Sequence, residues 1–232
     1  MTRHLDLNAD LGEEVTDDAA LLAVVTSANV ACGYHAGTTE IMRAVCERAA
    51  ELGVSVGAQV SYDDREGFGR VPRDVPRQVL REQVADQVGT LSAIASGAGT
   101  AVRYVKPHGA LYHRVIVDAE QAAAVLDGSG TLPVLGMPGA LLTGAAAAGR
   151  RTWLEGFPDR GYGDDGLLLP RDRPGALLDD VRDIAAQALE LASSTSRPVD
   201  SLCLHGDSPG AVEHARAVRR ALEGAGWSLR GL

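Results

Sequence analysis

The stretch Tyr104-Val105-Lys106-Pro107-His108-Gly109-Ala110-Leu111-Tyr112 joins a short apolar run to a polar loop near the middle of the chain. Lys106 is the only lysine in 232 residues. The other 21 of the 22 Lys and Arg residues are arginines. Either cation suits a solvated surface, but a compact ammonium whose pKa moves on burial differs from a fixed guanidinium fork. We therefore interpret Lys106 as a position that requires an amine. The alternative is a chance lysine at a strand end in water.

On both sides of this stretch the chain repeats one unit, an apolar run followed by a Gly-rich polar loop and an amphipathic helix. Seven apolar runs are expected to form strands: residues 4–8, 27–31, 54–58, 101–105, 132–135, 152–155 and 199–204. Because parallel strands need crossovers and crossovers are right-handed, seven such units predict a parallel sheet covered by helices. No break in composition divides the chain, so residues 1–232 are expected to form a single α/β domain.

Candidate functional groups follow six of the seven predicted strands. They are Asp10, Glu13, His35, Arg65, Arg70, Lys106, His108, Asp159, Arg160, His205 and Asp207. In a barrel the carboxyl ends of all strands converge on one mouth, whereas an open sheet concentrates its site near one switch point. This distribution favours a (β/α) barrel of about seven parallel strands.

Charge and composition exclude several classes of protein. A net charge of −9, with no Lys/Arg block longer than two residues, argues against a general nucleic-acid surface. No apolar run reaches membrane-spanning length and the N-terminus lacks the apolar core of a signal peptide, so we expect a cytoplasmic protein without a membrane partner. The three cysteines have unrelated spacings, which predicts reduced thiols rather than disulfides or a cysteine-based zinc site.

Histidines and carboxylates at the strand ends are the candidates for proton transfer. A neutral imidazole near carboxylates suits either proton transfer or metal binding, and His108 and His205 are the strongest candidates. Asp10 and Glu13 could hold a cation or act as a general base, the alternative being helix capping. His214, on the last predicted helix, is expected to be solvated.

Several other loop residues leave two interpretations open. The arginines Arg65, Arg70 and Arg160 could clamp a carboxylate bidentately or form loop salt bridges. Asp207 precedes Ser208 and Pro209, a predicted helix start, and could be a loop residue or a base at the barrel mouth. The chain has no Gly-x-x-x-x-Gly-Lys-Ser/Thr motif, so any ATP used in its chemistry is not bound here by a P-loop.

Six segments, taken together and in order, resemble the LamB/YcsF family of 5-oxoprolinase A subunits. They are Asp6-Leu-Asn-Ala-Asp-Leu-Gly-Glu13, Asn29-Val-Ala-Cys-Gly-Tyr-His-Ala-Gly37, Arg65-Glu-Gly-Phe-Gly-Arg70, Val105-Lys-Pro-His-Gly-Ala-Leu-Tyr112, Asp159-Arg160 with Tyr162 and Asp165-Gly166 through Pro170-Arg171, and His205-Gly-Asp-Ser-Pro-Gly-Ala211. They run from the first predicted strand to the last helix, so the resemblance covers essentially the whole chain.

The resemblance implies a (β/α) barrel akin to the glycoside hydrolase/deacetylase superfamily. It also implies ATP-dependent opening of 5-oxoproline to L-glutamate, together with partner B and C subunits. Opening a lactam requires deprotonation of water, stabilisation of the amide oxygen as charge develops, and protonation of the leaving nitrogen. We assign Asp10 or His108 to the water, Lys106 to the oxyanion and an arginine to the substrate carboxylate.

The same resemblance supplies the remaining predicted site residues. Glu13 and His35 are expected to join the catalytic group. The expected substrate-binding residues are Asn8, Asn29, Arg65, Arg70, Tyr112, Asp159, Arg160, His205 and Asp207.

One departure from the family pattern bears on metal binding. Where many relatives carry Gly-Ala-His-Pro-Ser-Tyr, this chain has Gly57-Ala-Gln-Val-Ser-Tyr62, so Gln59 replaces a histidine. Replacing an imidazole by a neutral amide weakens a cation site. The sequence thus leaves open whether the chain binds a divalent metal. If a metal is present, Asp10 and His108 are its expected ligands.

Two alternatives to a lactam-hydrolysing subunit stay open. The first is a non-catalytic ligand-binding or regulatory subunit that presents a small carboxylated ligand to its partners. The second is a metal-dependent amide or acetyl hydrolase that acts alone.

Overall fold

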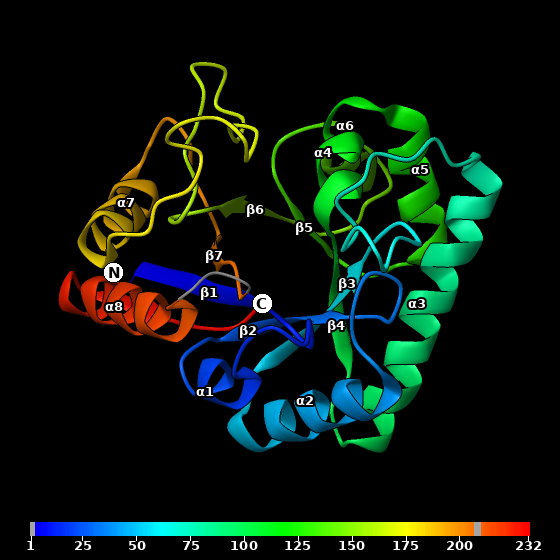
Figure 1. Ribbon diagram of the computed structural model, residues 1–232, viewed down its shortest axis with the longest axis horizontal. Helices are drawn as coiled ribbons and strands as arrows, with labels where there is room; N and C mark the ends of the chain where they lie inside the picture. Colours follow the sequence, from blue (N-terminus) through cyan, green and yellow to red (C-terminus); the bar gives the residue numbers. More distant parts are fainter. Residues whose placement is uncertain (1–2, 207–209) are drawn as a thin grey trace.

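The computed structural model describes residues 3–206 and 210–232 and contains a closed barrel of seven parallel strands. The strand order is β2-β3-β4-β5-β6-β7-β1-β8, and β1 also pairs with β2, which closes the ring (Figure 1). The strands are β1 Arg3–Leu11, β2 Ser27–Ala31, β3 Ser55–Val60, β4 Val102–Pro107, β5 Val134–Gly136, β6 Thr152–Gly156, β7 Ser201–Leu204 and β8 Trp227–Leu229. The predicted barrel architecture is confirmed.

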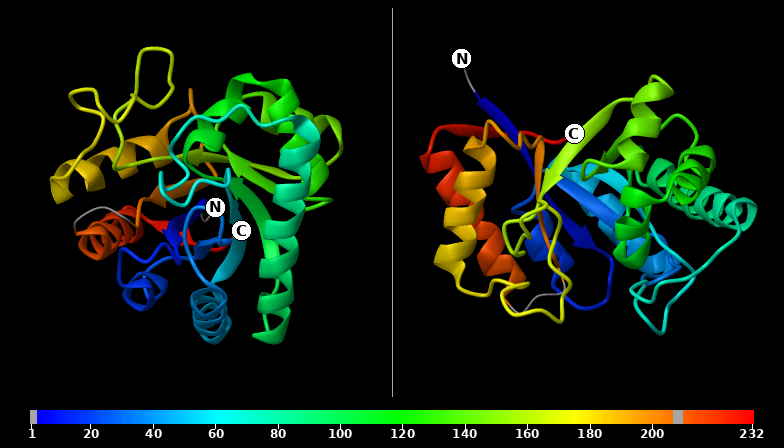
Figure 2. Two further views of the ribbon diagram at one scale, coloured as in Figure 1. Left: turned by 45° about the vertical axis from the view of Figure 1, so that its right-hand side comes forward. Right: turned by 90° about the horizontal axis from the view of Figure 1, so that it is seen from above.

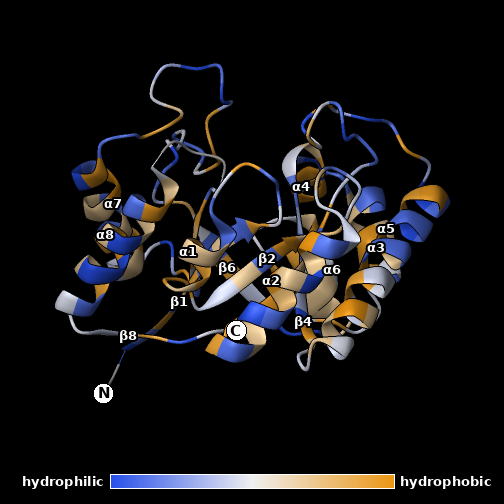
Figure 3. Ribbon diagram, turned by 60° about the horizontal axis from the view of Figure 1, so that its bottom comes forward, coloured by the Kyte–Doolittle hydropathy of each residue, from blue (hydrophilic) through white to orange (hydrophobic). Residues whose placement is uncertain are grey.

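Helices surround the strands, as the first two figures show (Figure 1, Figure 2). They are α1 Asp18–Leu22, α2 Thr39–Leu52, α3 Arg77–Gly97, α4 Gly109–Val117, α5 Ala119–Gly128, α6 Ala140–Ala147, α7 Val181–Ser193 and α8 Ala211–Gly224. Most carry hydrophilic patches on one side and hydrophobic patches on another (Figure 3), which is the pattern of a helix with one buried face. No helix in the described part of the chain is long and apolar enough to span a membrane.

Side chains alternate along the strands between the barrel interior and the layer beneath the helices. In β1 the apolar residues Leu5, Leu7 and Ala9 pack in the main hydrophobic core, while Asp6 and Asn8 bond to side chains of neighbouring strands. Because the side-chain period of a strand is two, Asp10 follows the same inward direction. The barrel interior along β1 is therefore polar, and these polar side chains continue to the carboxyl end of the strand.

The structure corrects three sequence-based expectations. The eighth strand, β8, was missed because its three residues follow the last helix and begin no further strand-loop-helix unit; it extends the sheet beside Arg3–Leu5 of β1. His214 is buried rather than solvated, on the α8 face that also carries Ala215 and Val218. The first helix, which the sequence predicts to be capped near Thr16, is instead capped by Asp17, whose side chain accepts from the Ala20 N–H. The predicted helix start at Ser208 and Pro209 lies outside the described residues.

The two ends of the barrel differ in what covers them. The long loops after β3 and β6 lie on one side, and the start of β1 and the C-terminus lie on the other (Figure 2, right). In the loop after β6, Arg160 donates to the carbonyl oxygens of Ala176 and Leu169, which fixes the course of the segment beside the mouth. We therefore expect the site at the end of the barrel that carries these long loops, which is the carboxyl end of the parallel strands.

Candidate functional site

A cavity of about 460 Å³ opens at the carboxyl ends of the strands. The side chains that line it from the strand ends and from α4 are Asp10, Lys106, His108, Tyr112, His113, Phe157 and His205. Its outer wall comes from two loops and includes Arg70, Arg160, Leu168, Arg171 and Asp172. Groups from distant parts of the sequence thus meet at one mouth, as the ring arrangement predicted.

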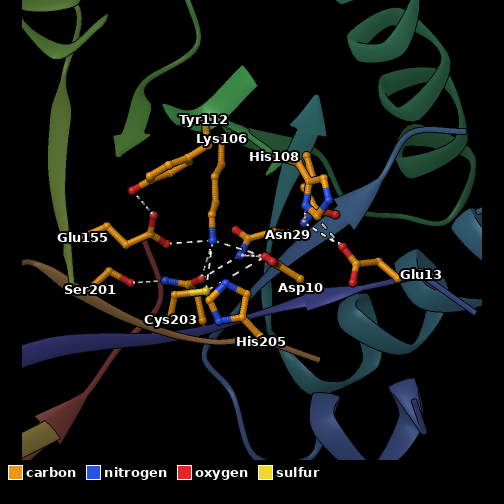
Figure 4. Close-up of polar contacts among 12 residues, drawn as sticks. Asp10, Glu13, Asn29, Lys106, His108, Tyr112, Glu155, Ser201, Cys203 and His205 are labelled. Carbon is orange, nitrogen blue, oxygen red and sulfur yellow. Dashed lines mark hydrogen bonds and ion pairs between the residues drawn. The ribbon is translucent and has the colours of Figure 1, made fainter. Parts of the chain in front are cut away.

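Lys106 forms the floor of this cavity and is almost completely buried. From β4 it reaches across the barrel, where its Nζ lies 2.8 Å from Glu155 Oε1, 3.0 Å from Cys203 Sγ and 3.2 Å from Asp10 Oδ1. Figure 4 shows the lysine side chain extending between Glu155 and Asp10. These partners belong to β6, β7 and β1, the part of the ring opposite β4.

The charges in this group fix its protonation states. Burial alone would lower the pKa of Lys106, but Asp10, Cys203 and Glu155 outweigh it and hold that pKa well above its ordinary value. Burial likewise opposes ionisation of Asp10, yet the ammonium of Lys106 holds the pKa of this carboxyl well below its usual range. Lys106 is consequently a cation at neutral pH, and neither a base nor a nucleophile.

Glu13, which the sequence pairs with Asp10, lies in a separate cluster with Gln59, His35 and His108. Gln59 Nε2 donates to Glu13 Oε1 at 3.0 Å and lies 2.9 Å from His108 Nδ1. The other nitrogen of His108 lies 3.1 Å from the Phe68 carbonyl oxygen, which can only accept, so Nε2 carries the proton. Burial and the neighbouring His35 lower the pKa of His108 well below its ordinary value. His108 is thus neutral, and both of its nitrogens are already bonded.

This second cluster is also the place where a metal could be sought. The donor atoms of Glu13, His35 and His108 lie within 4.8 Å of one another, and the Nε2 of His35 is buried without a hydrogen-bond partner. Nitrogen and carboxylate donors suit a divalent cation such as zinc.

The rings do not fit such an ion as they stand. The imidazoles of His35 and His108 stack with centroids 4.0 Å apart and planes 12° from parallel, so a cation could lie in the plane of only one ring. The amide of Gln59 also directs its N–H groups at Glu13 and His108, the atoms that a cation would contact. The cluster therefore forms a hydrogen-bonded wall of the cavity, and the predicted metal pair of Asp10 and His108 is divided between two clusters.

Asp159 and His205 form the third group. His205 Nδ1 lies 2.9 Å from Asp159 Oδ2, and the His205 backbone N–H donates to the same oxygen at 3.0 Å. Burial would raise the pKa of Asp159, but the interactions with His205 outweigh burial and lower it. Because a carboxylate can only accept, Nδ1 carries a proton and leaves Nε2 as the nitrogen for a ligand in the cavity. This is the arrangement of a positioned acid–base histidine.

The other predicted site residues have varied locations. Tyr112 lines the cavity and donates to Glu155, and Arg70 lines its rim. Arg65 bonds to Glu14 and to two loop carbonyls, and it is not among the described residues that line the cavity. Asn8 and Asn29 are fully buried inside the barrel, where Asn29 donates to Asn8 at 2.6 Å. Asp207 lies outside the described residues.

Sequence reasoning missed Glu155 and Cys203, both in contact with Lys106. A signal for Glu155 was present, because it is the one acidic residue in its apolar run and stands at the strand end. Cys203 gave no such signal, since a buried thiol inside a strand is ordinary core composition.

Comparisons with known proteins agree with this architecture. The family model described as LamB/YcsF matches residues 5–232. A relative from Streptomyces avermitilis, named as the A subunit of 5-oxoprolinase, is 53% identical over 242 residues, covering 96% of this chain and 97% of the relative. The crystal structure of a lactam utilization protein from Thermus thermophilus has a TM-score of 0.92 at 35% identity, with 100% of both chains covered.

A more distant structure shares the fold alone. A peptidoglycan N-acetylglucosamine deacetylase has a TM-score of 0.58 at 14% identity, covering 99% of this chain and 86% of the other. The match over residues 5–232 and the near-complete coverage of close relatives lead to one assignment: the chain belongs to the LamB/YcsF family.

Proposed function

We propose that this chain is the lactam-opening subunit of a 5-oxoprolinase, which hydrolyses 5-oxoproline to L-glutamate in an ATP-consuming complex with B and C subunits. The observation that carries the proposal is that a fixed cation, Lys106, and an acid–base histidine, His205, border the same cavity. The names of the close relatives, a 5-oxoprolinase A subunit and a lactam utilization protein, support the choice of a cyclic amide.

The two groups can divide the chemistry of amide hydrolysis between them. Water adds to the ring carbonyl carbon and gives its proton to Nε2 of His205, while the carbonyl electron pair moves to oxygen beside the Lys106 ammonium. The ring C–N bond then breaks, and the nitrogen takes the proton back from His205 to become the amino group of glutamate. Asp10 is a weak base because Lys106 holds its pKa low.

The outer wall of the cavity suits the carboxylate of the substrate. Arg70, Arg160 and Arg171 all line the cavity, and Arg160 also donates to the carbonyl oxygens of Ala176 and Leu169. Because guanidinium groups suit bidentate contact with a carboxylate, we assign the substrate carboxylate to this arginine-lined wall. ATP is assigned to the complex as a whole, because the sequence carries no P-loop motif.

The test is release of glutamate from 5-oxoproline by the B and C subunits with ATP, with and without this chain. We expect release only in the complete mixture, and a loss of about 10²-fold or more when His205→Gln replaces the wild-type chain. No increase over B and C alone would refute the proposal. Full activity of both His205→Gln and Lys106→Met chains would instead favour a non-catalytic binding subunit, and ATP-independent hydrolysis by this chain alone that a chelator abolishes would favour a metal-dependent hydrolase.

A further inference from the structure

Glu155 joins two residues of the cavity without bordering the cavity itself. It stands near the end of β6, its side chain is completely buried, and it is absent from the described residues that line the cavity. Its Oε1 lies 2.8 Å from Lys106 Nζ, and its Oε2 accepts a 2.9 Å hydrogen bond from the Tyr112 hydroxyl. Any effect of Glu155 on a bound ligand must therefore pass through Lys106 or Tyr112.

The contact with Glu155 is the shortest that Lys106 makes. Four polar atoms lie around the ammonium: Glu155 Oε1 at 2.8 Å in an ion pair, and the hydrogen-bond acceptors Cys203 Sγ at 3.0 Å, Asp10 Oδ1 at 3.2 Å and Asn8 Oδ1 at 3.5 Å. Because β7 lies between β6 and β1, the two carboxylates hold the nitrogen from opposite sides of Cys203. Without Glu155, the amine would be free to swing towards Asp10 and away from its present position.

We propose that Glu155 is a positioning residue for the reaction: its carboxylate, anchored by Tyr112, keeps the Lys106 ammonium charged and directed at the cavity. This inference rests on the proposed function, in which Lys106 stabilises the oxygen of the opening lactam.

The charge balance favours a role beyond stability. One carboxylate is enough to neutralise one buried ammonium, and a second one adds a desolvation cost. Burial by itself lowers the pKa of Lys106 and would favour the neutral amine, which supplies no positive charge to an oxyanion. The groups that oppose this are Asp10 on β1, Glu155 on β6 and the Cys203 sulfur on β7, with the face of Phe157 5.5 Å away. The second carboxylate thus preserves the charge and limits its orientation.

The composition of the chain provides a direct test, because Lys106 is its only lysine. Protein labelled with 15N-lysine gives one side-chain ammonium resonance, which reports this nitrogen alone. In the wild type we expect a sharp signal that persists to alkaline pH. In Glu155→Gln we expect the signal to shift, to broaden through faster hydrogen exchange, and to disappear at lower pH. Tyr112→Phe should change it in the same direction by less.

A kinetic measurement in the complete complex with B and C subunits accompanies the spectra. For Glu155→Gln we expect kcat to fall by about tenfold or more. Removal of a whole oxyanion donor lowers kcat by about 10²–10³-fold, and this sets the upper bound of the expected loss. The KM for 5-oxoproline should stay within about twofold, because the interaction acts on the transition state. The alkaline limb of the kcat profile should move to lower pH. Glu47→Gln, on the exposed side of α2, is the matched control and should change neither measurement.

The outcomes separate this inference from the proposed function. A Glu155→Gln chain with wild-type kcat overturns the positioning role, whether or not the resonance moves, and so does a loss of kcat with an unchanged resonance. If the wild-type complex releases no glutamate, the proposed function fails, and the resonance alone decides whether Glu155 holds the ammonium. Should Glu155→Gln not fold, Tyr112→Phe carries the same two measurements.

Discussion

At the scale of single residues, the buried charges of Lys106, Asp10 and Glu155 dominate the energetics of the cavity floor. All three are nearly inaccessible to water, and the ammonium lies within 3.2 Å of both carboxylates. Removing one member of such a group leaves an uncompensated charge in a low-dielectric site, which costs more than the pair contributes.

The variant Lys106→Met is therefore expected to lower the free energy of unfolding by about 3–5 kcal/mol. It retains much of the side-chain volume but leaves Asp10 and Glu155 facing each other without a cation. Urea unfolding measures the change. Arg48→Met, which removes the exposed ion pair of Arg48 with Glu51, is the control and should cost no more than about 1 kcal/mol. Equal effects of the two changes would contradict the account given for Lys106.

Gln59 decides whether the neighbouring cluster can hold a metal. Gln59→His replaces the amide that now bonds to Glu13 and His108 by a third imidazole beside His35. We expect the variant to bind about one zinc ion per chain, because loss of the amide bonds to Glu13 and His108 allows the stacked rings to turn apart, and three histidines and a carboxylate then complete a tetrahedral set. Metal analysis after dialysis and calorimetric titration measure the zinc content and the affinity for zinc. We expect the wild-type chain to bind zinc far more weakly than the variant. Tight zinc binding by the wild-type chain would show that the stacked rings open readily.

At the scale of elements, the turn from β4 into α4 fixes where His108 and the loop after β3 meet. The Ala110 N–H donates to the Gly69 carbonyl at 2.9 Å, and the His108 N–H donates to Val60 at 2.8 Å. Gly109 between them has a φ of 57°, and a Cβ there would overlap the Gly69 carbonyl oxygen. The glycine of the Pro-His-Gly sequence is thus required by the backbone of this turn.

Gly109→Ala is expected to destabilise the fold by about 2 kcal/mol or more, because a left-handed alanine and a backbone clash act together. The matched control is Gly89→Ala in the middle of α3, where an added Cβ meets nothing within 4 Å. That change should stabilise the chain by about 0.5–1 kcal/mol through helix propensity. Thermal unfolding of the two variants compares them, and a neutral Gly109→Ala would show that the loop after β3 can move aside.

At the scale of the whole molecule, the barrel closes where β1 meets both β2 and β7. Asp6 lies at this seam, fully buried, and accepts from Thr26 at 2.7 Å, from Ser27 at 2.6 Å and from Ser201. Burial raises the pKa of Asp6 from 3.8 to about 6, more than these hydrogen bonds lower it. The folded chain therefore keeps a proton on Asp6 at pH values where the unfolded chain has lost it.

This shift gives the barrel seam a pH dependence of known sign. Between pH 4 and 6 the folded state binds more protons than the unfolded state, so the contribution of Asp6 to stability is present at low pH and is lost as the pH rises. A shift of about two units corresponds to about 3 kcal/mol. The stability of Asp6→Asn relative to the wild type should rise by about this amount from pH 4 to pH 7 in urea unfolding. A constant difference would contradict the raised pKa, since all other groups cancel in the comparison.

The sequence by itself determined the repeating strand, loop and helix units, the barrel and the strand-end positions of Lys106, His108 and His205, because periodicity and loop composition are local properties of the chain. Only the tertiary structure decided which of these side chains meet. It separated Asp10 from Glu13, gave Lys106 its partners Glu155 and Cys203 from the opposite wall, and left His205 rather than His108 with a nitrogen for the cavity. The reason is physical: across a barrel, contacts depend on strand register and ring closure, and no local pattern in the sequence encodes these.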